Sequence, residues 1–331
     1  MRLLSMILPI ILLGASAVLP AQTRDDNWNR CKGSDSDLSI GGCTSIIQSG
    51  QESMVNLSYA FNNRSIAYSD KGEYDHAIQD LDQAIRLDPS NATAFNNRGI
   101  AYKHKGEYDR AIQDYDQAIR LNPNDAHAFN NRGNAYRDTG EDDRALQDLD
   151  QAIRLDPSNA TAFNNRGIAY KYKGEYDRAI QDYDQAIRLN PSDAHAFYNR
   201  GNAYRDKGEY DRAIQDYDQS IWLNPSYANA FDSRCRARVI VGQLQLALAD
   251  CNQSLTLRPN DAPTLDSRGF VHLKMKNSDA AIADYNAALA VNPTLASSLY
   301  GRGLAEGMKG DQAAAVKDIA AAKAIQPDIA D

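Results

Sequence analysis

Eight prolines placed 34 residues apart constrain this 331-residue chain more than any other feature. They are Pro89, Pro123, Pro157, Pro191, Pro225, Pro259, Pro293 and Pro327. A constant period of about 20–50 residues indicates that one supersecondary unit is stacked on copies of itself. Such a solenoid offers long surfaces rather than an enclosed catalytic pocket, so the spacing favours binding over catalysis.

The repeat 92–125 shows what each unit contains. Phe95 and Gly99 lie on one face at helical spacing, and Gly106 breaks that helix. A second apolar face follows, and Pro123 ends it because proline cannot continue a helix. Each unit is therefore predicted to be a helix-turn-helix hairpin. With proline as position 32, the eight units run 58–91, 92–125, 126–159, 160–193, 194–227, 228–261, 262–295 and 296–329.

The columns of these repeats carry a family resemblance. An aromatic residue at position 4, Gly at 8, Tyr at 11, Ala at 20, an aromatic residue at 24, Ala at 27 and Pro at 32 resemble the tetratricopeptide repeat (TPR). The resemblance implies an all-α, right-handed superhelical solenoid of hairpins whose first helices line a concave groove. It says little about function, because one fold serves many binding roles.

The N-terminal segment precedes the repeats. Residues 1–21 combine a basic start, an apolar stretch and small residues before Ala21, which predicts a secretory signal peptide. Cleavage after Ala17 and an uncleaved membrane anchor are the alternatives. Residues 22–57 are predicted to form a disulfide-linked cap, a degenerate half-repeat in which 37–47 aligns with 75–85. Export then places the protein in the periplasm or outside the cell, with no stable membrane insertion after cleavage.

Four cysteines in an exported chain suggest disulfides, although four allow three connectivities. Cys235 and Cys251 hold positions 8 and 24 of one repeat, which face each other in the TPR fold. A bridge between them would replace a glycine–aromatic contact. Cys31 and Cys43 flank the capping helix and form the other predicted pair. Free thiols and a zinc site are the alternatives, but no histidine accompanies either pair.

Position 7 is Arg and position 23 is Asp in all eight repeats. Most TPR units have a packed leucine at position 7, so a guanidinium there requires an acceptor. We predict structural ion pairs, with Asp182 or Asp148 as the acceptor of Arg166; an arginine ladder for acidic ligands is the alternative. The pairs of the central repeats involve Arg98, Arg132, Arg166, Arg200, Asp114, Asp148, Asp182 and Asp216.

Asparagine recurs on the first helix of the early repeats. By the TPR resemblance these positions face the groove, where an amide matches a peptide bond without reading its sequence. Inert inheritance from repeat duplication is the alternative. Position 6 provides Asn63, Asn97, Asn131, Asn165 and Asn199, and position 5 provides Asn62, Asn96, Asn130 and Asn164. Position 12 adds a basic stripe of Lys103, Arg137, Lys171 and Arg205, and His127 and His195 lie at position 2.

No motif for catalysis, a metal or a cofactor occurs in the sequence. The formal net charge of −8 argues against nucleic acid as a partner. The sequence therefore predicts an exported, non-enzymatic scaffold or adaptor that binds a protein or an extended peptide, with acidic side chains favoured by the basic stripe. The alternative is an accessory factor of the cell-envelope polysaccharide or peptidoglycan machinery. The oligomeric state is not predicted.

Overall fold

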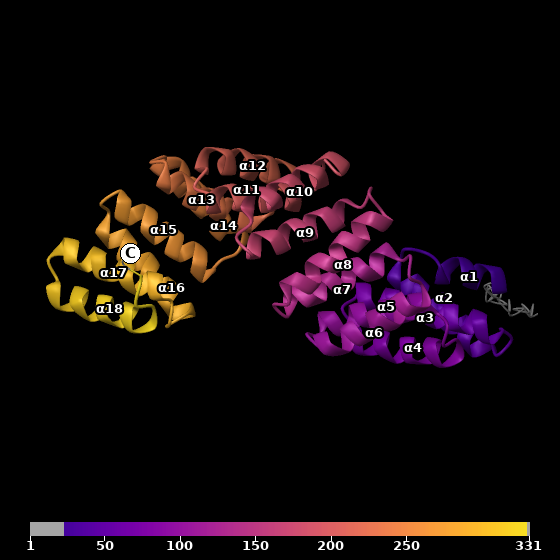
Figure 1. The fold of residues 1–331 in the computed structure, drawn as a ribbon. Coiled ribbons are helices and arrows are strands. Elements are labelled where there is room, and N and C mark those ends of the chain that lie inside the picture. Colours follow the sequence, from indigo (N-terminus) through magenta and orange to yellow (C-terminus); the bar gives the residue numbers. More distant parts are fainter. Residues whose placement is uncertain (1–22, 330–331) are drawn as a thin grey trace, which may run out of the picture. The chain divides into compact units, whose positions relative to one another are not determined.

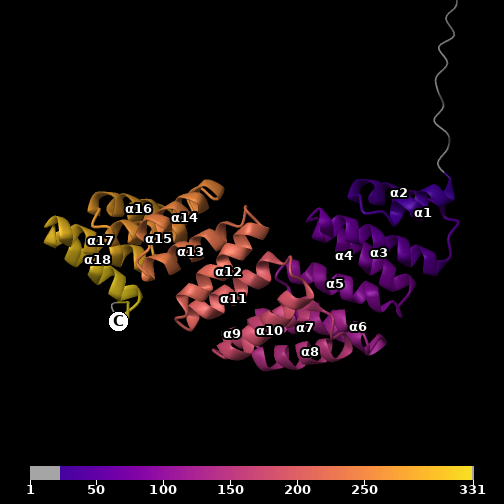
Figure 2. The ribbon, with the colours of Figure 1, turned by 90° about the horizontal axis from the view of Figure 1, so that it is seen from above.

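The computed structural model describes residues 23–329, and these residues form eighteen helices and no strand (Figure 1). The predicted signal peptide, residues 1–21, lies outside them. The chain divides into two compact units, residues 1–121 with helices α1–α6 and residues 122–331 with helices α7–α18. In each unit consecutive helices pack as antiparallel hairpins, as Figures 1 and 2 show. The fold is thus the all-α hairpin array that the repeats predict.

The helices of the first unit are α1 (Arg24–Cys31), α2 (Ser36–Ser49), α3 (Met54–Asp70), α4 (Tyr74–Leu87), α5 (Ala92–His104) and α6 (Tyr108–Leu121). Those of the second unit are α7 (Ala126–Asp138), α8 (Asp142–Leu155), α9 (Ala160–Tyr172), α10 (Tyr176–Leu189), α11 (Ala194–Asp206), α12 (Tyr210–Leu223), α13 (Ala228–Ile240), α14 (Leu244–Leu257), α15 (Ala262–Lys274), α16 (Ser278–Val291), α17 (Ala296–Lys309) and α18 (Gln312–Ile325).

The turn within a hairpin requires a residue with positive φ. Gly106 has φ +76°, a conformation that glycine adopts without strain. Its N–H bonds to the Lys103 carbonyl at 2.9 Å, and the Glu107 N–H bonds to the Tyr102 carbonyl at 2.9 Å, which closes α5 and starts the turn. The seventh repeat has Lys276 at this position, with φ +60°. Lysine therefore takes the same left-handed turn at a conformational cost.

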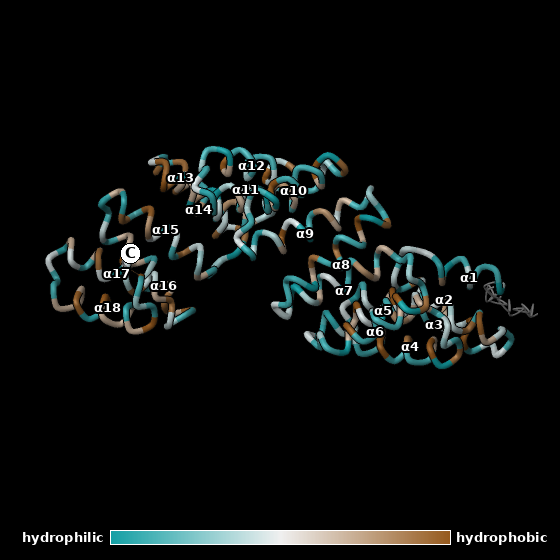
Figure 3. The backbone as a smooth tube through the Cα atoms, viewed as in Figure 1, coloured by the Kyte–Doolittle hydropathy of each residue, from teal (hydrophilic) through white to brown (hydrophobic). Residues whose placement is uncertain are grey.

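Small residues let the two helices of a hairpin approach closely. Ala179 at position 20 is fully buried, and a Cβ on Gly167 at position 8 would lie 2.7 Å from the ring of Tyr183. The tyrosine ring thus fills the space that glycine leaves, and the pair forms the centre of the hairpin. Along the helices, hydrophobic and hydrophilic residues alternate in short stretches, as expected for helices with one buried face (Figure 3).

The N-terminal cap differs from the predicted half-repeat. Residues 24–49 form a complete, shortened hairpin, with the eight-residue helix α1 packed on α2. Gly42 permits this contact, because a Cβ there would lie 2.6 Å from the Asn27 carbonyl oxygen. The first helix of the next hairpin, α3, begins at Met54 rather than at residue 58. The Ser53 side chain caps it by accepting a hydrogen bond from the Asn56 N–H.

Candidate functional site

The position-7 arginines connect hairpins to one another. Arg166 in α9 donates two hydrogen bonds to Asp182 in α10, from Nε at 2.8 Å and from Nη2 at 2.6 Å. Its third nitrogen, Nη1, donates to Asp150 in α8 at 2.7 Å. Arg200 repeats the arrangement with Asp216 and Asp184. These arginines act as clamps within and between hairpins rather than as a ladder for ligands.

All eight position-7 arginines pair with the aspartate at position 23 of their own repeat. The second acceptor differs from the one predicted for Arg166. Asp148 pairs with Arg132, and the acceptor in the preceding hairpin is Asp150, two residues further on. A shift of two residues turns a side chain by more than half a helical turn, so Asp148 faces its own hairpin and Asp150 the next one.

The two asparagine columns bond to each other. Asn97 Nδ2 donates to Asn62 Oδ1 of the preceding hairpin at 3.0 Å. In the second unit the same bond joins Asn165 to Asn130 at 2.9 Å and Asn199 to Asn164 at 3.0 Å. Asn96, at position 5 of the second repeat, is buried, and Asn63 and Asn131 at position 6 are partly buried. The asparagines are therefore not simple surface groups; they also join adjacent hairpins.

Each bond leaves one acceptor unused. The amide oxygens of Asn97, Asn165 and Asn199 accept no hydrogen bond from the residues that the structure describes. Asn97 and Asn199 are partly exposed, whereas Asn165 is buried. Because the inward N–H fixes the orientation of each amide, the free oxygens are held in a defined direction. We call Asn165 and Asn199, which lie in consecutive hairpins of the second unit, the asparagine ladder.

The basic stripe is largely paired. Arg137 donates to Asp138 at 2.7 Å and Arg205 donates to Asp206 at 2.7 Å. Lys171 lies 3.8 Å from Asp206. The position-13 aspartates thus reduce the positive potential that the stripe was predicted to carry; Lys103 likewise has an interaction partner.

The two histidines at position 2 have different surroundings. His127 is exposed. His195 is also exposed, and its Nδ1 lies 3.1 Å from the Tyr227 hydroxyl. Neither histidine lies in a cluster that could hold a metal, because residues 23–329 contain no group of three His, Cys, Asp or Glu side chains with that geometry.

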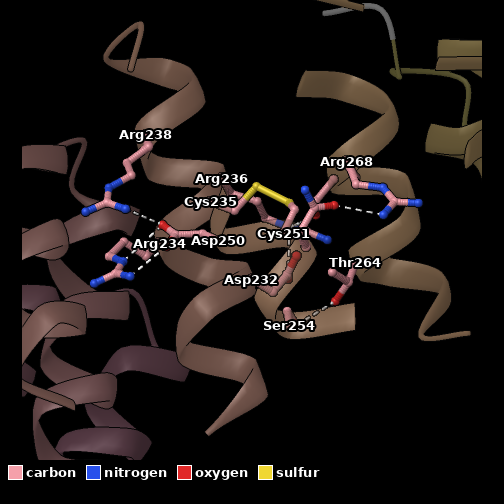
Figure 4. Close-up of a disulfide and its surroundings, with 12 residues drawn as sticks. Asp232, Arg234, Cys235, Arg236, Arg238, Asp250, Cys251, Ser254, Thr264 and Arg268 are labelled. Carbon is pink, nitrogen blue, oxygen red and sulfur yellow. Dashed lines mark hydrogen bonds and ion pairs between the residues drawn. A yellow bond between two sulfur atoms is a disulfide. The ribbon is translucent and has the colours of Figure 1, made fainter. Parts of the chain in front are cut away.

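Both predicted disulfides are present. Cys31 is bonded to Cys43, and Cys235 to Cys251. Figure 4 shows the second bridge between α13 and α14, where all other repeats but the first have a glycine and a large side chain. The same picture shows Arg234 and Arg238 converging on Asp250, with Arg238 Nη1 2.7 Å from its carboxylate. Arg238 replaces the position-11 tyrosine, so this hairpin uses a covalent and an ionic bond instead of aromatic packing.

A pocket of about 570 Å³ lies in the second unit, and the sequence did not predict it. Its lining comes mainly from the first helices α11, α13, α15 and α17, together with Tyr285 of α16. Apolar groups dominate the wall, among them Phe270, Leu273 and Leu304. Asp266 and Arg236 are among the few charged groups that line it. No helix of the described residues is long and apolar enough to cross a membrane.

Comparisons with known proteins follow the repeat pattern. Family models described as tetratricopeptide repeat match residues 164–229 and 269–328, residues 92–125 and residues 114–147. A model described as TPR repeat matches residues 67–106 and 133–172. The chain is a tetratricopeptide repeat protein. No curated protein sequence matches it.

Solved structures share the fold of this TPR protein at low identity. A tetratricopeptide repeat protein from Parabacteroides merdae is 22% identical, with a TM-score of 0.58 over 75% of this chain and 98% of that one. The APC/C hetero-tetramer Cut9-Hcn1 gives 18% identity and a TM-score of 0.64 over 92% and 61% of the two chains. Pseudomonas aeruginosa pilF is 20% identical, with a TM-score of 0.57 over 64% of this chain and 97% of that one.

The repeat columns of this TPR protein change near the pocket, and the change is visible in the sequence. The asparagines of positions 5 and 6 end before the last hairpins, where Asp266 and Gly301 take their places. In the sequence alone, the change at position 6 is repeat divergence and nothing more. Only the structure shows that the divergent side chains meet at one cavity.

Proposed function

We propose that this protein is an exported, non-enzymatic scaffold that binds an extended segment of a partner polypeptide along the asparagine ladder. The observation that carries the proposal is the inter-hairpin bond from each ladder asparagine, which leaves its amide oxygen free for an outside donor. A backbone N–H is the donor that every extended peptide presents. Because the ladder reads the backbone, it would hold a segment with little dependence on sequence.

The solenoid supports this use of the first helices. Repeat arrays form long binding surfaces from the same face of successive units, and each unit adds a few contacts. The asparagine oxygens recur along the first helices, so they would contact a peptide at intervals rather than at one point. Ion pairing of Arg137 and Arg205 with neighbouring aspartates weakens the case for an acidic partner. The charge of the partner is therefore an outcome of the test.

Export is supported by the two disulfides. Disulfides form and persist in oxidising compartments and are rare where thiols are kept reduced. All four cysteines are buried, so neither bridge is exposed to solvent. Together with the signal-like sequence of residues 1–21, they favour the periplasm or the extracellular space.

The test is selection of binding peptides from a random peptide library on the immobilised protein, followed by titration of two variants. N199A removes the bond to Asn164 and the outward oxygen, whereas N164A removes only the same bond. Both should lose similar stability, about 0.5–1.5 kcal/mol. Only N199A should weaken peptide binding, roughly two- to tenfold for one lost hydrogen bond.

Equal binding by both variants would place the peptide away from the ladder. A parallel screen with peptidoglycan fragments and anionic polysaccharides addresses the envelope-glycan alternative. Binding of a glycan that N199A weakens and N164A does not, with no peptide selected, would replace the peptide proposal by that alternative.

A further inference from the structure

The pocket in the second unit lies where three columns of the last two repeats differ from the early repeats. Position 5 carries Asp266 instead of asparagine, and position 6 carries Gly301 instead of a ladder asparagine. Position 9 carries Phe270, where the fifth repeat has Asn202. All three residues line the same cavity of about 570 Å³. In these repeats a cavity lined by other side chains therefore lies where the early repeats have asparagines.

The first chemical feature of this pocket is a hydroxyl without a partner. In the fifth repeat, Tyr217 donates its hydroxyl hydrogen to Asn202 Oδ1 at 2.8 Å. Tyr285 is the equivalent residue, and Phe270 has replaced its acceptor. The Tyr285 hydroxyl makes no hydrogen bond with the residues that the structure describes, and a Cβ on Gly301 would clash with it. Glycine therefore opens the hydroxyl to the pocket.

The second feature is a carboxylate without a cation. Asp266 accepts a hydrogen bond from the Ser298 hydroxyl at 2.6 Å, but no Lys, Arg or His nitrogen of the described residues lies within 4.0 Å of it. The other charged lining groups are paired: Arg205 with Asp206 at 2.7 Å and Arg236 with Asp232 at 3.2 Å. Burial raises the pKa of Asp266 by more than the serine hydroxyls and the more distant Arg236 lower it, so this carboxylate lacks a close counter-ion.

We propose that this pocket binds a lysine side chain of the partner polypeptide. The aliphatic stem would lie against Phe270, Leu273 and Leu304, and the ammonium would donate to the Asp266 carboxylate and the Tyr285 hydroxyl. An ammonium suits this site better than a guanidinium. One oxygen of Asp266 already accepts from Ser298, whereas the arginine fork requires two parallel acceptors.

This inference rests on the proposed function in one respect, that the ligand is a polypeptide, and it adds a side-chain pocket to a backbone-reading surface. The probe is Nα-acetyl-lysine methylamide, titrated into the full chain while the methyl resonances of Leu273 and Leu304 are followed. The matched probe is Nα-acetyl-norleucine methylamide, which has the stem but no charge. The lysine probe should bind at least about fivefold more tightly, since it adds a charge-assisted hydrogen bond.

Two pairs of variants locate the binding. D266N should abolish the preference for lysine and leave the norleucine affinity within about twofold. Y285F should weaken the lysine probe several-fold, whereas Y217F, the same change outside the pocket, should not. Unchanged circular dichroism spectra and melting temperatures show that the variants are folded. If D266N does not fold, the comparison of Y285F with Y217F still tests the proposal.

Equal affinity for the two probes, or a D266N variant that still prefers lysine, would overturn the inference. The ladder comparison of N199A and N164A does not involve this pocket, because neither asparagine lines it. Failure of the lysine probe with a normal ladder result therefore refutes the pocket alone. A ladder that fails while the lysine probe binds refutes the ladder and keeps the pocket.

Discussion

Arg166 in α9 donates a hydrogen bond from Nη1 to the carboxylate of Asp150 in α8, at 2.7 Å. This bond crosses from one hairpin to the next, whereas the pairing of Arg166 with Asp182 stays within a hairpin. The two carboxylates differ in exposure, since the side chain of Asp182 is 7% exposed and that of Asp150 is 40% exposed. The clamp thus has a buried half and a solvated half.

The two halves should contribute unequally to stability. D182N should cost about 1–3 kcal/mol, because it leaves a guanidinium without its buried counter-charge. D150N should cost less than about 1 kcal/mol, since water screens an exposed pair. Double-mutant cycles with R166L, measured by urea denaturation, should give a larger coupling energy for Asp182 than for Asp150. Equal coupling energies would mean that burial does not set the strength of the clamp.

The sequence predicted the repeat architecture because the same residue type recurs at the same position of successive repeats, and each such residue type indicates a structural role. The glycine at position 15, the alanine at position 20 and the proline at position 32 mark turn, helix contact and helix end. The acceptor in the neighbouring hairpin was missed for Arg166, because positions 23 and 25 both carry aspartate. Only the rotation between consecutive hairpins decides which of the two faces it.

The disulfide between Cys235 and Cys251 replaces a glycine–tyrosine contact such as that of Gly201 and Tyr217. The double variant C235S/C251S should lower stability by about 3 kcal/mol, the value expected for a loop of roughly 15 residues. The double variant C235G/C251Y should restore part of this loss by rebuilding the glycine–tyrosine contact. Thermal melts of both variants under oxidising conditions test the comparison. If the serine variant is the more stable one, the bridge does not stand in for the aromatic contact.

The asparagine columns show where sequence reasoning about the site is incomplete. The TPR resemblance predicts that these positions of the first helix face the groove. In the structure Asn62 and Asn130 are buried, and each accepts a hydrogen bond from an asparagine of the next hairpin. Changing the position-6 asparagines to alanine therefore removes packing contacts as well as groove contacts. A periodic polar residue can serve packing and binding at once, and its spacing alone does not separate the two roles.

Acid should loosen the N-terminal hairpin through Glu52. Its carboxylate accepts hydrogen bonds from Arg24 at 2.6 Å, Trp28 at 3.1 Å and Asn56 at 2.7 Å. Arg24 is the main cause that lowers the pKa of Glu52 from about 4.5 to about 2. A depressed folded-state pKa gives stability that is present above pH ~4.5 and is lost as the pH falls toward ~2.

Trp28 reports this change directly, because its indole donates to Glu52. In a W222F background, which removes the only other tryptophan, Trp28 fluorescence should change as the pH falls through that window. The E52Q variant should lack this transition and should already show altered fluorescence at neutral pH. An unchanged titration in E52Q would assign the transition to another group.

Replacing Lys276 by glycine should stabilise the seventh hairpin. Lys276 has φ +60° at position 15, where the sixth repeat has Gly242 with φ +81°. This conformation costs a residue with a side chain roughly 1–2 kcal/mol of folding free energy, and it costs glycine little. Glycine, however, loses more backbone conformational entropy when the chain folds. K276G should therefore stabilise the protein by about 0.5–1 kcal/mol. The matched change G242A should destabilise it by about 1–2 kcal/mol, and no steric contact contributes, because nothing lies within 4 Å of a Cβ there. Urea denaturation followed by circular dichroism measures both. A K276G variant that is no more stable than the parent would show that contacts of the lysine side chain offset the strain of its turn.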